Sequence, residues 1–218
     1  MTLEATLYWS VRSPYSYLAT PRLFALACEF DVSIKVRPVY PHALRDKTLA
    51  GARGPMWIAY FKTDIVRTAR YLGLPIAWPR PDPVAVNPET GEALADQPRA
   101  QRLTRLVEAA EEAGAGLAFI HALSRRLWAP ETDDWEAPGV LKAAAEEAQL
   151  DLAELDARIS SKPDDYEARI AENQRREYED GHWGVPVMVF EGEPFFGQDR
   201  IDQFVWRLKQ AGLEKRRD

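Results

Sequence analysis

The chain has 218 residues, of which 46% are hydrophobic and 28% charged, so it can build a hydrophobic core without disulfides or metal ions. Its single cysteine excludes an intramolecular disulfide and a cysteine-based zinc cluster. The net charge of −6 argues against a nucleic-acid partner held through phosphates, and no apolar run approaches the roughly 20 residues of a membrane span. We therefore expect a globular protein of the reducing cytoplasm with no nucleic-acid, membrane or metal partner.

The first forty residues predict a strand, a helix and a second strand. Residues 3–9 alternate apolar and polar side chains and are rich in strand-forming types. Ser13 and Pro14 are a typical helix start, with serine as N-cap and proline in the first helical position. The helix should run to about Glu29 and residues 33–39 should form the second strand, which completes a βαβ unit.

The middle of the chain is predicted to be helical. Residues 58–72 carry apolar side chains at helical spacing, and Gly73 is the expected C-cap. A proline-rich segment, residues 75–98, is expected to be irregular. Further helices are expected over residues 103–110, 117–127, 140–148, 152–159 and 164–180, the last of them charged and exposed.

The last forty residues return to strand patterns. Residues 186–190 form an apolar run, a tight turn follows, residues 194–196 form a second short strand, and Asp199 opens a closing helix. This order predicts an α/β protein with a thioredoxin-like fold interrupted by an inserted all-helical domain. Residues 1–45 and 181–218 would form the thioredoxin-like domain, and residues 46–180 the insertion.

The first motif, Ser13-Pro14-Tyr15-Ser16, occupies the place where thioredoxin-like redox proteins carry Cys-x-x-Cys. Hydroxyls replace both thiols, and the only cysteine, Cys28, is expected on the apolar side near the far end of the helix, so dithiol exchange is excluded. A helix N-terminus still offers free N–H groups and a positive dipole end, which lower the pKa of a nearby thiol. Ser13 is therefore a candidate to hold a thiol cofactor; the alternative is a simple helix cap.

Two further motifs lie near the C-terminus. The Gly-Val-Pro motif of residues 184–186 ends in a proline, which is usually structural at the start of a strand. In a thioredoxin-like fold this proline is typically cis and faces the N-terminus of the first helix. The backbone before it could then pair with an extended, peptide-like cofactor. In the Phe-Gly-Gln-Asp-Arg motif of residues 196–200, the amides of Gln198 and Asp199 could hold a carboxylate, and the Asp199 side chain an ammonium group. Alternatively, Asp199 only caps the closing helix.

Together, these three motifs resemble those of the 2-hydroxychromene-2-carboxylate isomerase family, which is related to kappa-class glutathione transferases. The resemblance implies a glutathione-dependent homodimer that isomerises an aromatic, electrophilic substrate by reversible addition of a thiolate. It implies that Ser13 holds the glutathione sulfur as thiolate. It also implies cofactor contacts from the backbone of Val185 and Pro186 to the cysteinyl unit, and from Gln198, Asp199 and Arg200 to the γ-glutamyl end.

Candidate substrate contacts lie on both sides of this site. Tyr60 and Asp64, with Arg67, share one helix face by their spacing and form either a surface network or a wall of the active site. Tyr15 could face the pocket. His182 and Trp183 immediately precede the Gly-Val-Pro motif. His182 could act as an acid or base, or only bond a loop carbonyl. Trp183 could contact an aromatic substrate, or only pack locally.

The sequence departs from the family pattern at the start of the insertion. Trp57 stands where the family often has a lysine, and residues 50–55 lack its asparagine; Arg53 or Lys62 could replace the charge. These departures leave the substrate open. Trp128 and Trp135 are candidates for an apolar dimer face.

Three alternatives to the isomerase remain on sequence grounds. A kappa-like glutathione transferase would begin with the same thiolate. A non-catalytic thioredoxin-like module would bind a peptide or protein at the proline edge without needing the motif of residues 196–200. A redox enzyme that used Cys28 alone would place its thiol about four turns from the helix N-terminus, away from the dipole field that would activate it.

Overall fold

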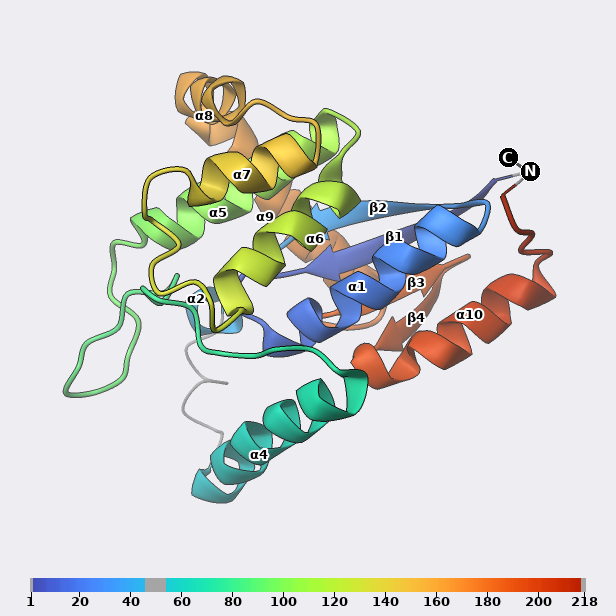
Figure 1. Ribbon diagram of the computed structural model, residues 1–218, viewed down its shortest axis with the longest axis horizontal. Helices are drawn as coiled ribbons and strands as arrows, with labels where there is room; N and C mark the ends of the chain where they lie inside the picture. The colour runs from blue at the N-terminus through green and yellow to red at the C-terminus, as the bar shows by residue number, and fades with distance from the viewer. Residues whose placement is uncertain (1, 46–53, 217–218) are drawn as a thin grey trace.

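A four-stranded sheet lies at the centre of the computed structural model, which describes residues 2–45 and 54–216 (Figure 1). The strand order is β2-β1-β3-β4. Strand β1 (Leu3–Trp9) runs parallel to β2 (Val32–Pro38) and antiparallel to β3 (Val187–Phe190), which pairs in turn with β4 (Glu193–Phe196). This confirms the predicted α/β, thioredoxin-like fold, with strand bounds shifted by one residue at β2, β3 and β4.

Helix α1 (Pro14–Glu29) begins and ends where the sequence predicts. Ser13 is its N-cap, because the Ser13 Oγ accepts the N–H of Ser16 at 3.1 Å. Leu23 and Leu26 face the core, whereas Cys28 is exposed, so its predicted place on the apolar side is wrong. Two residues past Leu26 a helix has turned by about 200°, which brings Cys28 to the opposite face.

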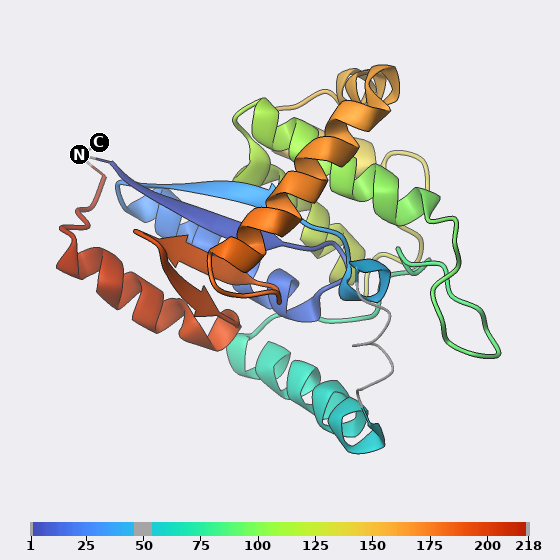
Figure 2. The same ribbon diagram turned by 180° about the vertical axis from the view of Figure 1, so that it is seen from behind.

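Helices cover both faces of the sheet (Figure 2). Helix α9 (Pro163–Glu179) crosses the back face, while α1, α6 (Gly116–Trp128) and α10 (Ile201–Gln210) lie in front. The final insertion helix is exposed over most of its length, as predicted, but one side of it is buried, which was not predicted. One stripe of α9 is buried at positions spaced by four, three and four residues: Tyr166, Ile170, Asn173 and Glu177. Asn173 and Glu177 are polar, so the apolar pattern of the sequence does not reveal this stripe.

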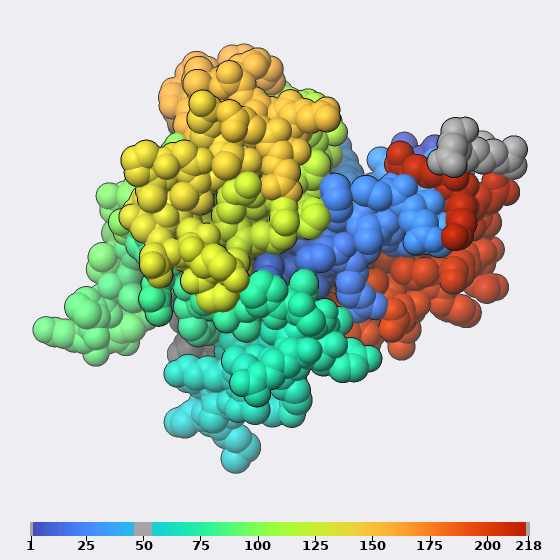
Figure 3. All heavy atoms as spheres, in the orientation of Figure 1, coloured from blue at the N-terminus to red at the C-terminus, as the bar shows by residue number. Residues whose placement is uncertain are grey.

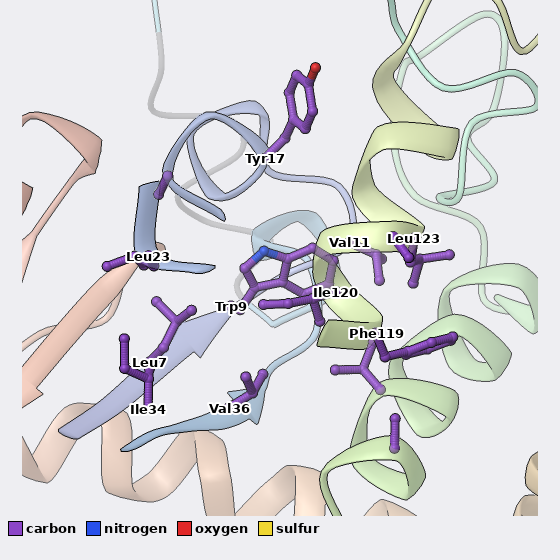
Figure 4. Packing of buried hydrophobic residues seen from close by; sticks show 14 of the residues in the cluster. Leu7, Trp9, Val11, Tyr17, Leu23, Ile34, Val36, Phe119, Ile120 and Leu123 are labelled. Carbon is purple, nitrogen blue, oxygen red and sulfur yellow. The ribbon is translucent and has the colours of Figure 1, made fainter. Parts of the chain in front are cut away.

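The inserted helices share one core with the sheet (Figure 4). Besides α6 and α9 they include α5 (Pro98–Glu112), α7 (Val140–Glu147) and α8 (Leu152–Ser161). Leu7 and Trp9 of β1 pack with Phe119 and Ile120 of α6 in a single cluster. Trp128 and Trp135 are only 1% and 2% exposed in this core, so the prediction that they form an apolar dimer face is wrong.

Helix α4 (Pro55–Leu72) projects from the rest of the molecule (Figure 3). Ile65 and Ala69 are its buried residues, and Gly73 ends it in the left-handed region at φ 67°, as predicted for a C-cap. The segment that follows is irregular up to α5, as predicted, apart from one bridge between Val86 and Ala93.

Two short helices complete the described chain, α2 (His42–Arg45) and the 3₁₀ helix η1 (Gln198–Arg200). Among the described helices, none has the length and apolar character that crossing a membrane requires. The division into two domains stays a prediction.

Candidate functional site

Ser13 and the Gly-Val-Pro motif, far apart in sequence, meet at the N-terminus of α1. The Ser13 Oγ lies 3.4 Å from the carbonyl oxygen of Val185, to which it donates a long hydrogen bond. The Val185-Pro186 peptide bond is cis, as the thioredoxin-like fold led us to expect. The structure thus brings together the hydroxyl, the helix end and the proline edge that the sequence singled out.

The loop before Pro186 is held by close ring packing. The Gly184 N–H donates to Nδ1 of His182 at 2.9 Å, and the His182 ring stacks on Phe196 with centroids 3.9 Å apart. A Cβ at residue 184 would lie 2.8 Å from a ring carbon of Phe196, so glycine is the residue that this approach permits. Among the described residues, the Val185 N–H has no hydrogen-bond partner, and it stays available to an extended ligand.

Two features of the His182 environment favour the neutral form of its imidazole. Burial lowers the pKa of His182 from its ordinary value. The Nδ1 lone pair that accepts the Gly184 N–H also exists only when Nδ1 carries no proton. Trp183 is partly exposed and stacks on His182 with centroids 5.4 Å apart, so both predicted substrate contacts lie beside the proline loop.

Tyr15 connects α1 with the projecting helix α4. Its hydroxyl donates to Asp64 at 2.6 Å, and Arg67 donates to the same carboxylate at 2.5 Å. Burial, together with the neighbouring Asp64, raises the pKa of Tyr15. Burial alone would raise the pKa of Asp64, but the bonds from Tyr15 and Arg67 outweigh it and lower that pKa. Tyr60 completes the cluster, with Arg67 5.6 Å above its ring.

An aromatic wall, formed by Trp57, Phe61 and Trp78, extends this cluster. Trp57 stacks on Phe61 with centroids 4.9 Å apart, and Phe61 lies 5.7 Å from Tyr15 and 6.3 Å from Trp78. Phe61 and Trp78 were not predicted as site residues. The four-residue spacing from Trp57 to Phe61 was a signal that could have revealed the first, whereas Trp78 lies in the irregular segment, where no periodicity guides a prediction.

The motif of residues 196–200 forms η1 after β4. The Asp199 side chain is 59% exposed and pairs with Arg200 at 2.8 Å. Neither η1 nor α10 has a side-chain cap, so the alternative that Asp199 serves as a cap is wrong. Gly197 has φ 101°, and a Cβ there would lie 2.5 Å from the Asp199 carboxylate. The backbone carbonyl oxygen of Gln198 accepts a hydrogen bond from Arg22 at 3.2 Å.

The charge of the Asp199 carboxylate makes a minor contribution to the raised pKa of Tyr15. The charged groups proposed to replace the family lysine are not placed at this site. Lys62 is exposed on α4, and Arg53 lies outside the described residues, as do residues 50–52. Across residues 2–45 and 54–216, no three potential metal ligands of the His, Cys, Asp and Glu types come together.

A capped helix end opposite a cis-proline, on a β2-β1-β3-β4 sheet, defines a thioredoxin-like protein, here without the redox dithiol. A family model described as a DSBA-like thioredoxin domain matches residues 5–209. The chain belongs to this family.

Similar proteins include an isomerase and a disulfide reductase. The 2-hydroxychromene-2-carboxylate isomerase of Sphingobium xenophagum is 29% identical over 209 residues, which cover 93% of this chain and 96% of the relative. A solved structure of 2-hydroxychromene-2-carboxylate isomerase has a TM-score of 0.71, with 21% identity over 96% of both chains. The cytosolic disulfide reductase DsbM from Pseudomonas aeruginosa, solved with GSH, has a TM-score of 0.59, with 19% identity over 96% of this chain and 99% of that one.

Proposed function

We propose that the protein is a glutathione-dependent isomerase of the 2-hydroxychromene-2-carboxylate isomerase type, acting on an aromatic, electrophilic substrate. The observation that carries the proposal is the meeting of the Ser13 hydroxyl with the Val185 carbonyl at the N-terminus of α1, in a chain 29% identical to that isomerase. The structure of DsbM with GSH supports the choice of cofactor, because it has the same fold.

The residues at this site fit glutathione. The partner-free Val185 N–H suits an extended peptide carbonyl, and the exposed Asp199 carboxylate suits the ammonium group of a γ-glutamyl unit, with Gln198 and Arg200 beside it. When bound, glutathione supplies a thiolate, which adds reversibly to a carbon conjugated with a carbonyl group and so turns a rigid double bond into a rotatable single bond.

The part of Ser13 in this chemistry is to donate a hydrogen bond to the sulfur. The N–H of Ser16 fixes the Ser13 oxygen, while the hydroxyl proton is held only loosely by Val185 at 3.4 Å. The hydroxyl can therefore turn its proton toward a thiolate and keep the cap intact. A hydrogen bond to a charged group contributes about 1.5–3 kcal/mol, and the positive end of α1 adds to the same stabilisation.

The aromatic wall is the surface proposed to receive the substrate ring. Trp57 and Phe61 present stacked rings beside Tyr15, which is two residues after Ser13. The Tyr15 proton is committed to Asp64, so Tyr15 would orient the substrate and α4 rather than donate a proton. Because Nδ1 of His182 accepts the Gly184 N–H, the neutral ring carries its proton on Nε2 and would donate a hydrogen bond to the substrate from that atom.

Calorimetric titration with reduced glutathione, beside S-methylglutathione, tests the proposal. Saturable binding that weakens when the sulfur is blocked is the expected result, because Ser13 and the helix end act on a thiolate. Conversion of aromatic enones is then measured with and without glutathione. An absence of binding at millimolar glutathione would refute the proposal.

A second candidate, a module that binds extended peptides, is favoured by the same partner-free Val185 N–H. The two functions differ at Asp199. Asp199→Ala should weaken glutathione binding strongly if the γ-glutamyl contact exists, and should leave peptide binding nearly unchanged. A transferase differs from the isomerase only in its product, so chromatography that detects a stable glutathione conjugate would identify the transferase.

A further inference from the structure

A buried ion pair adjoins the loop of residues 183–186, the proline loop, but includes none of the candidate site residues. Arg45, at the end of α2, pairs with Glu177 on α9, and the two side chains are 7% and 0% exposed. Among the described residues, the second carboxylate oxygen of Glu177 has no hydrogen-bond partner. A buried pair of this kind costs desolvation free energy that its attraction barely offsets, so stability alone gives little reason for it.

The pair is tied to the backbone of the proline loop at two points. The second guanidinium nitrogen of Arg45 donates to the carbonyl oxygen of Trp183 at 3.2 Å. The N–H of His182 donates to the backbone oxygen of Glu177, also at 3.2 Å. In addition, the ring of His42, on the same short helix as Arg45, lies edge-on to Trp183 at 4.7 Å. One planar guanidinium therefore joins α9, α2 and the residue two positions before Val185.

We propose that Arg45 and Glu177 are positioning residues that hold the loop of residues 183–186 against Ser13, and that they thereby set the affinity for glutathione. The inference rests on the proposed function for its ligand. The fork of Arg45 binds the Glu177 carboxylate with one nitrogen and the Trp183 carbonyl with the other, so the fixed helix α9 determines where that carbonyl lies. A displaced Trp183 would move the Val185 N–H and carbonyl that face the ligand.

The decisive variant replaces the pair by apolar residues of similar size, Arg45→Met with Glu177→Leu. Such a replacement commonly leaves stability unchanged or raises it, yet it removes the donor to Trp183. We expect a melting temperature close to that of the parent, a dissociation constant for glutathione raised roughly tenfold, and an unchanged kcat. Hydrogen exchange of the peptide that contains residues 183–185, measured without any ligand, should become faster.

Two controls separate this role from a structural one. Arg105→Met breaks another ion pair of α9, that of Arg105 with Glu167 at 2.7 Å, and should change neither glutathione affinity nor exchange in the loop. Arg45→Lys keeps a charge beside Glu177 but lacks the planar fork, so it should weaken glutathione binding. This variant carries the test if the double variant does not fold.

Unchanged exchange and unchanged affinity in the Arg45 variants would overturn the positioning role. If the unsubstituted protein does not bind glutathione but the Arg45 variants exchange faster in the loop, glutathione is refuted as the ligand. The same result would support the role of Arg45 in holding the loop.

Discussion

Replacement of Ser13 by alanine separates two roles that one hydroxyl performs. As N-cap, the Ser13 Oγ accepts the Ser16 N–H at 3.1 Å, and loss of such a cap costs about 1 kcal/mol, or about 2–4 °C of melting temperature in a chain of this size. As hydrogen-bond donor to a thiolate it would contribute about 1.5–3 kcal/mol, which corresponds to a roughly 10- to 150-fold loss of turnover. Turnover should therefore fall far more than stability.

The chain offers a matched control for this experiment in Asp151. This residue caps α8 through bonds from the amides of Ala153 at 2.7 Å and Glu154 at 3.3 Å. Asp151→Ala should lower the melting temperature by a similar amount and leave glutathione-dependent turnover intact. Ser13→Thr, which retains a hydroxyl, should recover much of both properties. If Ser13→Ala kept full turnover with glutathione, the assignment of Ser13 to the sulfur would be wrong.

Four further outcomes are expected. Cys28→Ser should leave the glutathione-dependent rate unchanged, because the thiol is exposed and lies at the far end of α1. Asp199→Ala should raise the dissociation constant for glutathione at least tenfold, as measured by calorimetry, because it removes a charge-assisted contact. Tyr15→Phe should raise the pKa of Asp64, followed by carboxyl NMR, since one of its hydrogen bonds is lost. Replacement of His182 by Gln should reduce the loss of unfolding free energy between pH 7.5 and 5.5, measured by urea denaturation.

The sign of the last effect follows from the lowered pKa of His182. The unfolded chain binds the proton first as the pH falls below about 6.5, so this group contributes stability that is present above that pH and lost below it. Glu177 acts in the opposite direction, because burial raises its pKa to about 7 and the fold gains stability as that carboxyl takes up its proton. Comparison of parent and variant at each pH cancels the contribution of Glu177. An identical pH dependence in the two proteins would contradict the account given for His182.

For the other three variants, the contradicting results are equally direct. A slower rate in Cys28→Ser would revive a thiol mechanism. Undiminished glutathione affinity in Asp199→Ala would remove the γ-glutamyl contact and favour the peptide-binding module. An unmoved Asp64 pKa in Tyr15→Phe, with Arg67→Gln as the control that should raise it, would show that Tyr15 does not bind this carboxylate in solution.

The parts of the fold that the sequence predicts are those with local signals. Helix α1 is bounded by a Ser-Pro start, and the strands show alternation or apolar runs. The buried stripe of α9 escaped prediction because Asn173 and Glu177 are polar, and their burial depends on distant partners: Arg37 and Arg45. Periodicity of apolar residues carries no information about such pairs.

The same distinction applies to the candidate site. Ser13 and Val185 were paired by their places in a fold, and the structure puts them 3.4 Å apart. The hydrogen bonds from Tyr15 to Asp64 and from Arg45 to Trp183 join elements that no pattern in the sequence relates to each other. Contacts of this kind depend on how helices pack in three dimensions, which only the folded chain reveals.

The place of β1 in the sheet has a consequence for the order in which the protein is made. One edge of β1 pairs with β2, which follows it closely in the chain, and the other edge pairs with β3, where Tyr8 lies opposite Val187. At about 5–20 residues per second, a ribosome needs roughly 7–30 s to reach β3 after β2 has been completed. During that time the edge of β1 that β3 will cover is an open template for strands of neighbouring nascent chains. Slow synthesis or crowded polysomes should therefore favour aggregation of this protein, and binding by chaperones that recognise extended apolar segments should counteract it.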